Sequence, residues 1–187
     1  ILNSSNGTTW TLVSVGNSGN SWSSVTSPTA NDLDGVTFGN NTFVAVGASG
    51  NIVRSTDKGT SFDNATSPTA NYLSGVTFGN NTFVGVGELG NIVRSTDNGS
   101  SFDNVTSPTA NNIRGVSFGN NTFVAAGYGG NIVRSTDNGT TWDNATSPTT
   151  NNFLGVGFLY NTFVAVGASG NIVRSTDNGT TWDNVTS

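Results

Sequence analysis

The stretch SPTANNIRGVSFGNNTFVAAGYGGNIVRSTDNGTTWDNAT, residues 107–146, is the unit from which nearly the whole chain is built. Nearly identical copies occupy residues 27–66, 67–106 and 147–186, so that Ser-Pro-Thr recurs every 40 residues without an insertion. A remainder of 26 residues precedes the first copy. Self-similarity at a fixed period of about 20–50 residues is typical of solenoids and propellers, so the repeat decides the fold before any local feature does.

Each copy contains four short segments rich in Val, Ile, Phe and Thr, and turns containing Gly and Asn separate them. In the third copy we expect strands at residues 113–118, 122–126, 131–135 and 141–145. The segment TFVAVG at residues 42–47 is apolar on both faces, which is typical of a sheet covered on both sides. Four strands per unit, with each sheet packed between copies of itself, predict an all-β protein with the β-propeller fold. A linear β-solenoid is the alternative, although its repeats are usually shorter.

The remainder at residues 1–26 is expected to form a degenerate closing blade. The prediction is a five-bladed propeller in a single domain over residues 1–187, with full blades at 27–66, 67–106, 107–146 and 147–186. Two alignments of the remainder stay open. One places Trp22 on the aromatic position of the full copies, with Gly19 retained and Asn17 replacing an Asp; the other matches residues 13–20 with 44–51.

A second motif lies inside every copy. The eight residues STDNGTTW at 135–142 and 175–182 match the pattern S-x-D-x-G-x-x-W, and STDKGTSF at 55–62 and STDNGSSF at 95–102 match it with Phe. Together with stretches such as TFVAVGASGNIVRSTDNGTTW at 162–182, this pattern strongly resembles the Asp-box, or BNR-like, β-propeller repeats of bacteria. These repeats include the photosystem assembly-factor type, and sialidases carry the same box. The resemblance covers all four copies and implies the fold; its family spans glycosidases, lectins, receptors and assembly factors, so it implies little about function.

The box is interpreted as structural. It is expected in the hairpin that joins the third and fourth strands, where its Asp accepts backbone N–H bonds, its Gly has a positive φ, and its aromatic side chain packs between blades. One carboxylate per loop is too few for calcium, so no metal site is expected. The residues in these roles are Asp57, Gly59 and Phe62; Asp97, Gly99 and Phe102; Asp137, Gly139 and Trp142; and Asp177, Gly179 and Trp182.

Positions that differ between the copies are expected on one face of the ring. Adjacent antiparallel strands reverse direction, so the loop between the second and third strands opens on the same face as the blade-to-blade loop. The box hairpin and the FGNN turn open on the other face, where Leu159 and Tyr160 replace Gly-Asn. We call the first face the variable face. Its variable positions include the apolar residues Leu33, Leu73, Ile113 and Phe153, which share one repeat position, and also Leu89 and Leu154. The candidate ligand-binding residues on it are Asp32, Asp34, Tyr72, Glu88, Asn112, Arg114, Tyr128, Asn152, Ser49 and Ser169. The alternative is relaxed drift in exposed loops.

Composition excludes several kinds of chemistry. The chain has no Cys and no His, so thiol nucleophiles, Ser-His-Asp triads and soft-metal sites are excluded. With 6 basic and 11 acidic side chains the net charge is −5, which argues against nucleic-acid binding. No apolar stretch approaches the ~18 residues of a membrane span. Because the chain begins at Ile1 and not at Met, we expect a processed segment and an extracellular location.

Catalysis is not expected, and neither is a cofactor. The resemblance to sialidases would imply several converging Arg side chains, a Tyr nucleophile and a carboxylate. Here the arginines repeat at one strand position, which spreads them around the ring: Arg54, Arg94, Arg134 and Arg174. A sialidase-type glycosidase, with Asp32 and Asp34 as paired carboxylates, is a minor alternative.

The sequence therefore predicts a non-enzymatic extracellular binding module. Shallow sites with Tyr, Asn and single carboxylates suit carbohydrate, and several equivalent sites on one rigid body would give the avidity of a lectin. The partners expected are glycans and, in the alternative interpretation, further copies of the chain in a structural, adhesive or self-assembling scaffold. Near-identity of the repeats also fits an engineered or consensus-like propeller without a ligand.

Overall fold

Four antiparallel four-stranded sheets follow one another along the chain, one for each 40-residue repeat. This computed structural model describes residues 2–3, 11–12 and 23–185. The first blade contains β3 (Leu33–Gly39), β4 (Thr42–Gly47), β5 (Ile52–Ser55) and β6 (Asp63–Asn64). The second contains β7 (Leu73–Gly79), β8 (Thr82–Gly87), β9 (Ile92–Ser95) and β10 (Asp103–Val105). The third contains β11 (Ile113–Gly119), β12 (Thr122–Gly127), β13 (Ile132–Ser135) and β14 (Asp143–Ala145). The fourth contains β15 (Phe153–Leu159), β16 (Thr162–Gly167), β17 (Ile172–Ser175) and β18 (Asp183–Asn184).

A single 3₁₀ turn joins the second and third strands of every blade. These turns are η1 (Ala48–Gly50), η2 (Glu88–Gly90), η3 (Tyr128–Gly130) and η4 (Ala168–Gly170). The predicted strands all exist, with shifted ends. The third strand of the third blade begins after Asn131, because the Asn131 N–H donates to the carbonyl oxygen of Tyr128 and closes the turn. The fourth strand begins after Trp142, because the residues before it belong to the box hairpin.

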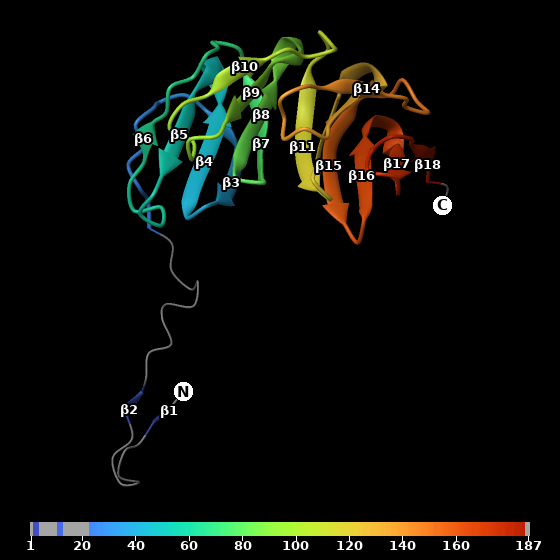
Figure 1. The fold of residues 1–187 in the computed structure, drawn as a ribbon. Helices are drawn as coiled ribbons and strands as arrows, with labels where there is room; N and C mark the ends of the chain where they lie inside the picture. The colour runs from blue at the N-terminus through green and yellow to red at the C-terminus, as the bar shows by residue number, and fades with distance from the viewer. Residues whose placement is uncertain (1, 4–10, 13–22, 186–187) are drawn as a thin grey trace.

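The blades stand side by side along an arc, from the first blade at one end to the fourth at the other (Figure 1). The first strands β3, β7, β11 and β15 contact one another in succession across the blade boundaries. Glycine makes this approach possible: a Cβ on Gly35 would lie 3.1 Å from the Gly75 Cα, and one on Gly115 would lie 3.1 Å from the Gly155 Cα. Next to Gly155 no atom lies within 4 Å of such a Cβ, so the row of close contacts ends at the fourth blade.

The core consists of three apolar clusters, each between two neighbouring blades. Between the first and second blades, Val44, Val46 and Ile52 pack against Leu73, Phe83, Val93 and Phe102. The same positions, 40 and 80 residues further on, build the other two clusters. Burial of these side chains is the main stabilising term for the array. The all-β propeller fold predicted from the repeat is confirmed.

The segment before the first blade contains one short strand pair. β1 (Leu2–Asn3) pairs with β2 (Thr11–Leu12) in antiparallel register. Residues 6–10 between them read NGTTW, as residues 138–142 do in the third box, which is a signal that our alignments of the remainder did not use. The closing blade predicted at residues 1–26 lies largely outside the described residues, because 1, 4–10 and 13–22 are not among them.

Candidate functional site

The box hairpins form a hydrogen-bond motif that repeats in every blade. In the third blade, Asp137 Oδ1 accepts bonds from the Thr141 N–H at 2.9 Å and the Ser135 hydroxyl at 2.8 Å. Its Oδ2 accepts a bond of 2.6 Å from the Thr141 hydroxyl, and the Ser135 hydroxyl oxygen accepts the Gly139 N–H at 2.9 Å. The box glycines have φ between 77° and 84°. The Asp and Gly roles predicted from the sequence are therefore present.

These bonds change the acidity of the box carboxylates. The backbone N–H and then the hydroxyl of Thr181 hold the pKa of Asp177 at about 2, below the ordinary value of 3.8, although burial opposes the shift. The hydroxyl and the backbone N–H of Ser61 do the same for Asp57, whose pKa is also about 2. A lowered pKa follows when a carboxylate accepts several hydrogen bonds. These groups are ionised and structural at neutral pH.

The box aromatics lie where the sequence predicted, between blades. Phe102, Trp142 and Trp182 are buried in the three core clusters. The two Trp side chains also donate a hydrogen bond to the carbonyl oxygen of their own box glycine, at 3.2 Å and 3.1 Å. Phe62 of the first box is only half-buried, because it faces the end of the array.

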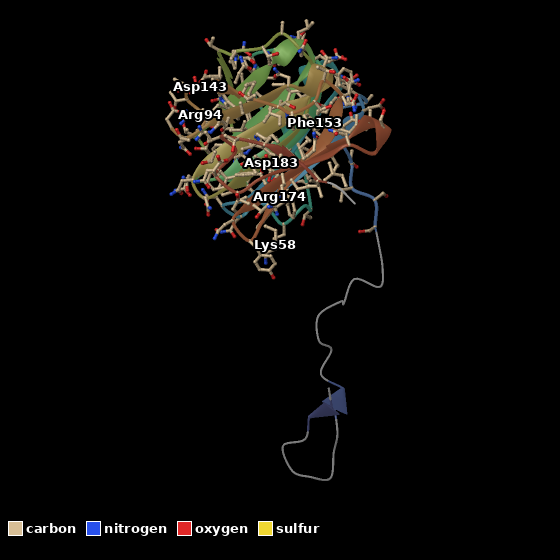
Figure 2. All side chains as sticks on the ribbon, turned by 90° about the vertical axis from the view of Figure 1, so that its right-hand side faces the viewer. Lys58, Arg94, Asp143, Phe153, Arg174 and Asp183 are labelled. Atoms are coloured by element: carbon tan, nitrogen blue, oxygen red, sulfur yellow. The ribbon has the colours of Figure 1, made fainter. Side chains whose placement is uncertain are left out.

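The repeated arginines do not converge on one point, and two of them, Arg54 and Arg94, bond the next blade. Arg54 Nη1 donates to the Ser100 hydroxyl at 3.0 Å, and Arg94 Nε donates to the Asn138 carbonyl oxygen at 2.7 Å. Each bond links a third strand to the box hairpin of the next blade. Figure 2 shows Arg94 and Arg174 as separate side chains on different parts of the array. This arrangement differs from a catalytic cluster of arginines.

The loops divide between two faces as predicted. A Cβ on Gly50 of η1 would lie 2.0 Å from the Thr69 carbonyl oxygen, so this 3₁₀ turn touches the following blade-to-blade loop. On the opposite face, Asn98 Nδ2 of the second box donates to the Thr42 hydroxyl beside the FGNN turn, at 2.6 Å. The ten candidate residues therefore belong to loops and strand ends of the variable face.

Four of the candidates meet near the starts of the first strands. The Asp34 carboxylate, as hydrogen-bond acceptor and as a neighbouring charge, raises the pKa of Tyr72 above its ordinary value of 10.0, and burial acts in the same direction. The positive charge of Arg114 lowers the pKa of Tyr72, so the guanidinium lies near the Tyr72 hydroxyl. The Cζ of Arg114 lies 5.8 Å from the centroid of the Tyr128 ring, within cation–π range. We call Asp34, Tyr72, Arg114 and Tyr128 the rim cluster; Asp32 adds a further charge beside it.

Two of the other candidates, Asn112 and Asn152, have structural roles. Asn112 Oδ1 accepts the Leu89 N–H, and Asn152 Oδ1 accepts the Gly129 N–H, both at 2.9 Å. Each amide thus fixes the 3₁₀ turn of the preceding blade. Glu88, Ser49 and Ser169 are exposed on their own turns, and Ser49 and Ser169 have positive φ.

The apolar variable positions require a correction. Leu73, Ile113 and Phe153 were counted among loop positions of the variable face, yet they are buried in the core clusters with exposures of 0%, 1% and 0%. A register shift between these residues and the glycine two positions later turns the intervening side chain toward the rim instead. Ser74, the intervening residue of β7, donates a 2.6 Å hydrogen bond to the Ile113 carbonyl oxygen. Ser74 is one of the positions that differ between copies on the variable face, but it is not among the ten candidate ligand-binding residues.

Within residues 2–3, 11–12 and 23–185, no group of three or more His, Cys, Asp or Glu side chains could hold a metal ion. In the same part of the chain no helix has the length and apolar character needed to cross a membrane.

Sequence comparisons identify no relative. No protein-family model matches the chain, and no curated protein matches it. Solved structures do match. A YCF48 structure bound to D1 peptide has a TM-score of 0.66 and 18% identity, over 89% of this chain and 57% of that one. The structure of YCF48 from Cyanidioschyzon merolae has a TM-score of 0.66 and 19% identity, over 86% of this chain and 58% of that one.

The computationally designed Ika4 protein has a TM-score of 0.68 and 14% identity, over 81% of this chain and 94% of that one. An ancestral GH74 enzyme has a TM-score of 0.69 and 21% identity, over 84% of this chain and 24% of that one. The chain has a β-propeller fold. It spans less than two thirds of the length of the two YCF48 structures, and at these identities the likeness extends to the fold alone. The expected resemblance to assembly-factor-type propellers is thereby confirmed for the fold.

Proposed function

We propose that the chain is a non-enzymatic binding module that binds carbohydrate at the rim cluster. The observation that carries the proposal is the convergence of Asp34, Tyr72, Arg114 and Tyr128 from three different blades on one part of the variable face. None of these residues recurs at its equivalent position in another blade. Drift alone gives no reason for charged and aromatic substitutions to meet at one place.

The chemistry of the cluster suits a sugar. Carboxylate and guanidinium groups bond the hydroxyls of a sugar ring, and tyrosine rings supply flat apolar surface against which its C–H face stacks. Because the residues are not repeated, we propose one site per chain. This revises the prediction of several equivalent sites, since Asn112 and Asn152 are engaged with neighbouring turns.

Binding without catalysis is supported by the use of the polar groups. The arginines of the first two blades bond neighbouring box hairpins. The positive charges of a sialidase-type site are therefore not gathered at the rim cluster, where Arg114 is the one arginine among the residues that define it.

Calorimetry with sugars selected on a glycan array tests the proposal. We expect Tyr128→Ala and Arg114→Ala each to weaken binding about tenfold or more. The matched control is Tyr160→Asn, which restores the repeat residue at a tyrosine that is 88% exposed on the opposite face. Absence of any sugar binding at millimolar concentration would reject the proposal, and wild-type affinity in Tyr128→Ala would reject the site.

A second candidate is an extended peptide, because one YCF48 structure of similar fold contains a bound D1 peptide. A peptide array probed with the same three variants distinguishes the two ligands. Peptide binding that is lost in Arg114→Ala, with no sugar bound, favours this second candidate.

A further inference from the structure

The two ends of the blade array expose apolar side chains whose equivalents at the internal joints are buried or partly buried. On the fourth blade, Val164, Val166 and Ile172 are 37%, 45% and 41% exposed. Their equivalents in the first blade, Val44, Val46 and Ile52, are at most 1% exposed. We call the fourth-blade surface the trailing face; Figure 2 looks onto this end of the array, with Arg174 and Asp183 labelled.

The first blade exposes the opposite surface, which we call the leading face. Leu33, Val36 and Phe38 are 39%, 66% and 54% exposed, whereas Leu73, the equivalent of Leu33, is fully buried. Val53 on the same sheet is already covered. A hollow of about 210 Å³ lies over this face, lined by Leu33, Val36 and Phe62 and by the preceding residues Val25 to Ser27.

The trailing and leading faces are the two halves of one interface. At each internal joint, the side chains equivalent to those of the trailing face pack against the side chains equivalent to those of the leading face. The chain forms this joint three times within itself and exposes one half at each end. The occupant that matches an exposed half is therefore the other half, on a second copy.

The polar contacts of the internal joints are only partly available at the two ends. Arg94 donates to the Asn138 carbonyl oxygen of the next box, and the residue equivalent to Asn138 in the first box is Lys58. Arg174, the arginine of the trailing face, is exposed. A Cβ on Gly99 would lie 2.8 Å from Val44 of the preceding blade, whereas nothing lies within 4 Å of one on Gly59.

We propose that two copies of this chain associate through these faces and close into a ring of eight blades. The trailing face of each copy packs on the leading face of the other, and Arg174 bonds the box hairpin at Lys58 of its partner. Eight blades lie within the range of about four to eight that propellers adopt. A heterologous contact of this kind either closes into a ring or continues into a filament.

Two departures from the repeat weaken this joint relative to the internal ones. Lys58 brings a second positive charge beside Arg174, and Leu159 replaces a glycine. A Cβ on Gly39, Gly79 or Gly119 would lie 2.1 Å from the Phe ring of the next blade, and the fourth blade has Leu159 at this position. In the dimer, the Phe38 ring of one copy must therefore change its rotamer to avoid Leu159 of the other copy. Val185 of that other copy must also replace Val25 at the joint, because the two valines occupy the same repeat position. Overpacking of this kind predicts that Leu159→Gly tightens association about tenfold or more.

Sedimentation equilibrium over a wide concentration range tests the proposal. We expect wild-type chains to reach twice the 19.1 kDa chain mass and to stop there. Ile172→Lys on the trailing face and Val36→Lys on the leading face should each give monomers. The matched control is Leu89→Lys, a side chain that is 68% exposed on the variable face, and it should leave the dimer intact. Circular dichroism and thermal unfolding of each variant show whether it folds.

The decisive experiment mixes the Ile172→Lys and Val36→Lys variants. Each variant retains one functional face, so an equimolar mixture should form a dimer through one joint, more weakly than the wild type. A wild-type monomer at all concentrations, a dimer unaffected by Ile172→Lys, or a mixture that stays monomeric would overturn the proposal. Polymers that grow with concentration would overturn the closed ring.

Discussion

Arg94 and Asn138 lie in neighbouring blades, and Arg94 Nε donates a hydrogen bond of 2.7 Å to the Asn138 carbonyl oxygen. Asn138 Nδ2 in turn donates to the Thr82 hydroxyl of the earlier blade at 2.7 Å. One box residue thus receives a bond from the preceding blade through its backbone and returns one through its side chain. The joint before it is related but not identical: Asn98 Nδ2 donates to the Thr42 hydroxyl at 2.6 Å, and Arg54 Nη1 donates to the Ser100 hydroxyl at 3.0 Å.

At the rim cluster, Asp34→Asn should change the ionisation of Tyr72. The Asp34 carboxylate raises the pKa of Tyr72 as hydrogen-bond acceptor and as a neighbouring negative charge. Removing that charge should bring the Tyr72 pKa back toward 10.0. Ultraviolet titration of the three tyrosines resolves the change, with Tyr72→Phe identifying the affected transition. An unchanged titration curve would show that Asp34 and Tyr72 do not interact.

Much of this fold could be predicted because each repeat encodes its own turns and strands. The box roles of Asp137 and Gly139 follow from short-range chemistry, and the structure confirms them. The burial of Leu73 could not be predicted in this way, because a position that differs between copies is expected to be exposed. The register shift after Leu73 also breaks the simple alternation of strand side chains, which is how β-bulges act.

The rim cluster itself was only half predictable. Strand reversal places its residues on one face, but the meeting of Asp34 with Tyr72 depends on how closely neighbouring first strands approach. That distance is set by glycine contacts such as the one between Gly35 and Gly75. Such contacts arise between repeats, and no pattern within one repeat specifies them.

Gly115→Ala should destabilise the contact between the third and fourth blades. The new Cβ would lie 3.1 Å from the Gly155 Cα and 3.2 Å from the Val156 nitrogen, and backbone atoms have little room to move. We expect the free energy of unfolding to fall by about 1–3 kcal/mol, measured by urea denaturation. Gly155→Ala is the control, since no atom lies within 4 Å of its Cβ, and it should be neutral in the monomer. Equal losses in both variants would contradict the interblade explanation.

At the third box, Trp142 should tolerate Phe but not Ala. Phe already fills the equivalent site at Phe102, which is 3% exposed, so Trp142→Phe retains the apolar packing. It loses the 3.2 Å hydrogen bond to the Gly139 carbonyl oxygen, which should lower the free energy of unfolding by about 1 kcal/mol. Trp142→Ala should lower it by about 3–5 kcal/mol, because a cavity opens between the blades. Thermal and urea unfolding rank the variants, and similar losses for Phe and Ala would contradict this interpretation.

Acid should weaken the fold through the box carboxylates. The folded-state pKa of Asp177 is about 2 and its ordinary value is 3.8, so the carboxylate is stabilising above the ordinary value. That contribution is lost as the pH falls from about 4 toward 2, when the folded form also takes up the proton. Each exposed carboxylate contributes little, but the motif occurs in four blades.

We expect the melting temperature to fall between about pH 4 and pH 2, and to fall less steeply in Asp177→Asn than in the wild type. Asp183→Asn, an exposed carboxylate on β18, is the matched control and should retain the wild-type slope. A melting temperature that is independent of pH below 4 would contradict the stabilising role of the box carboxylates.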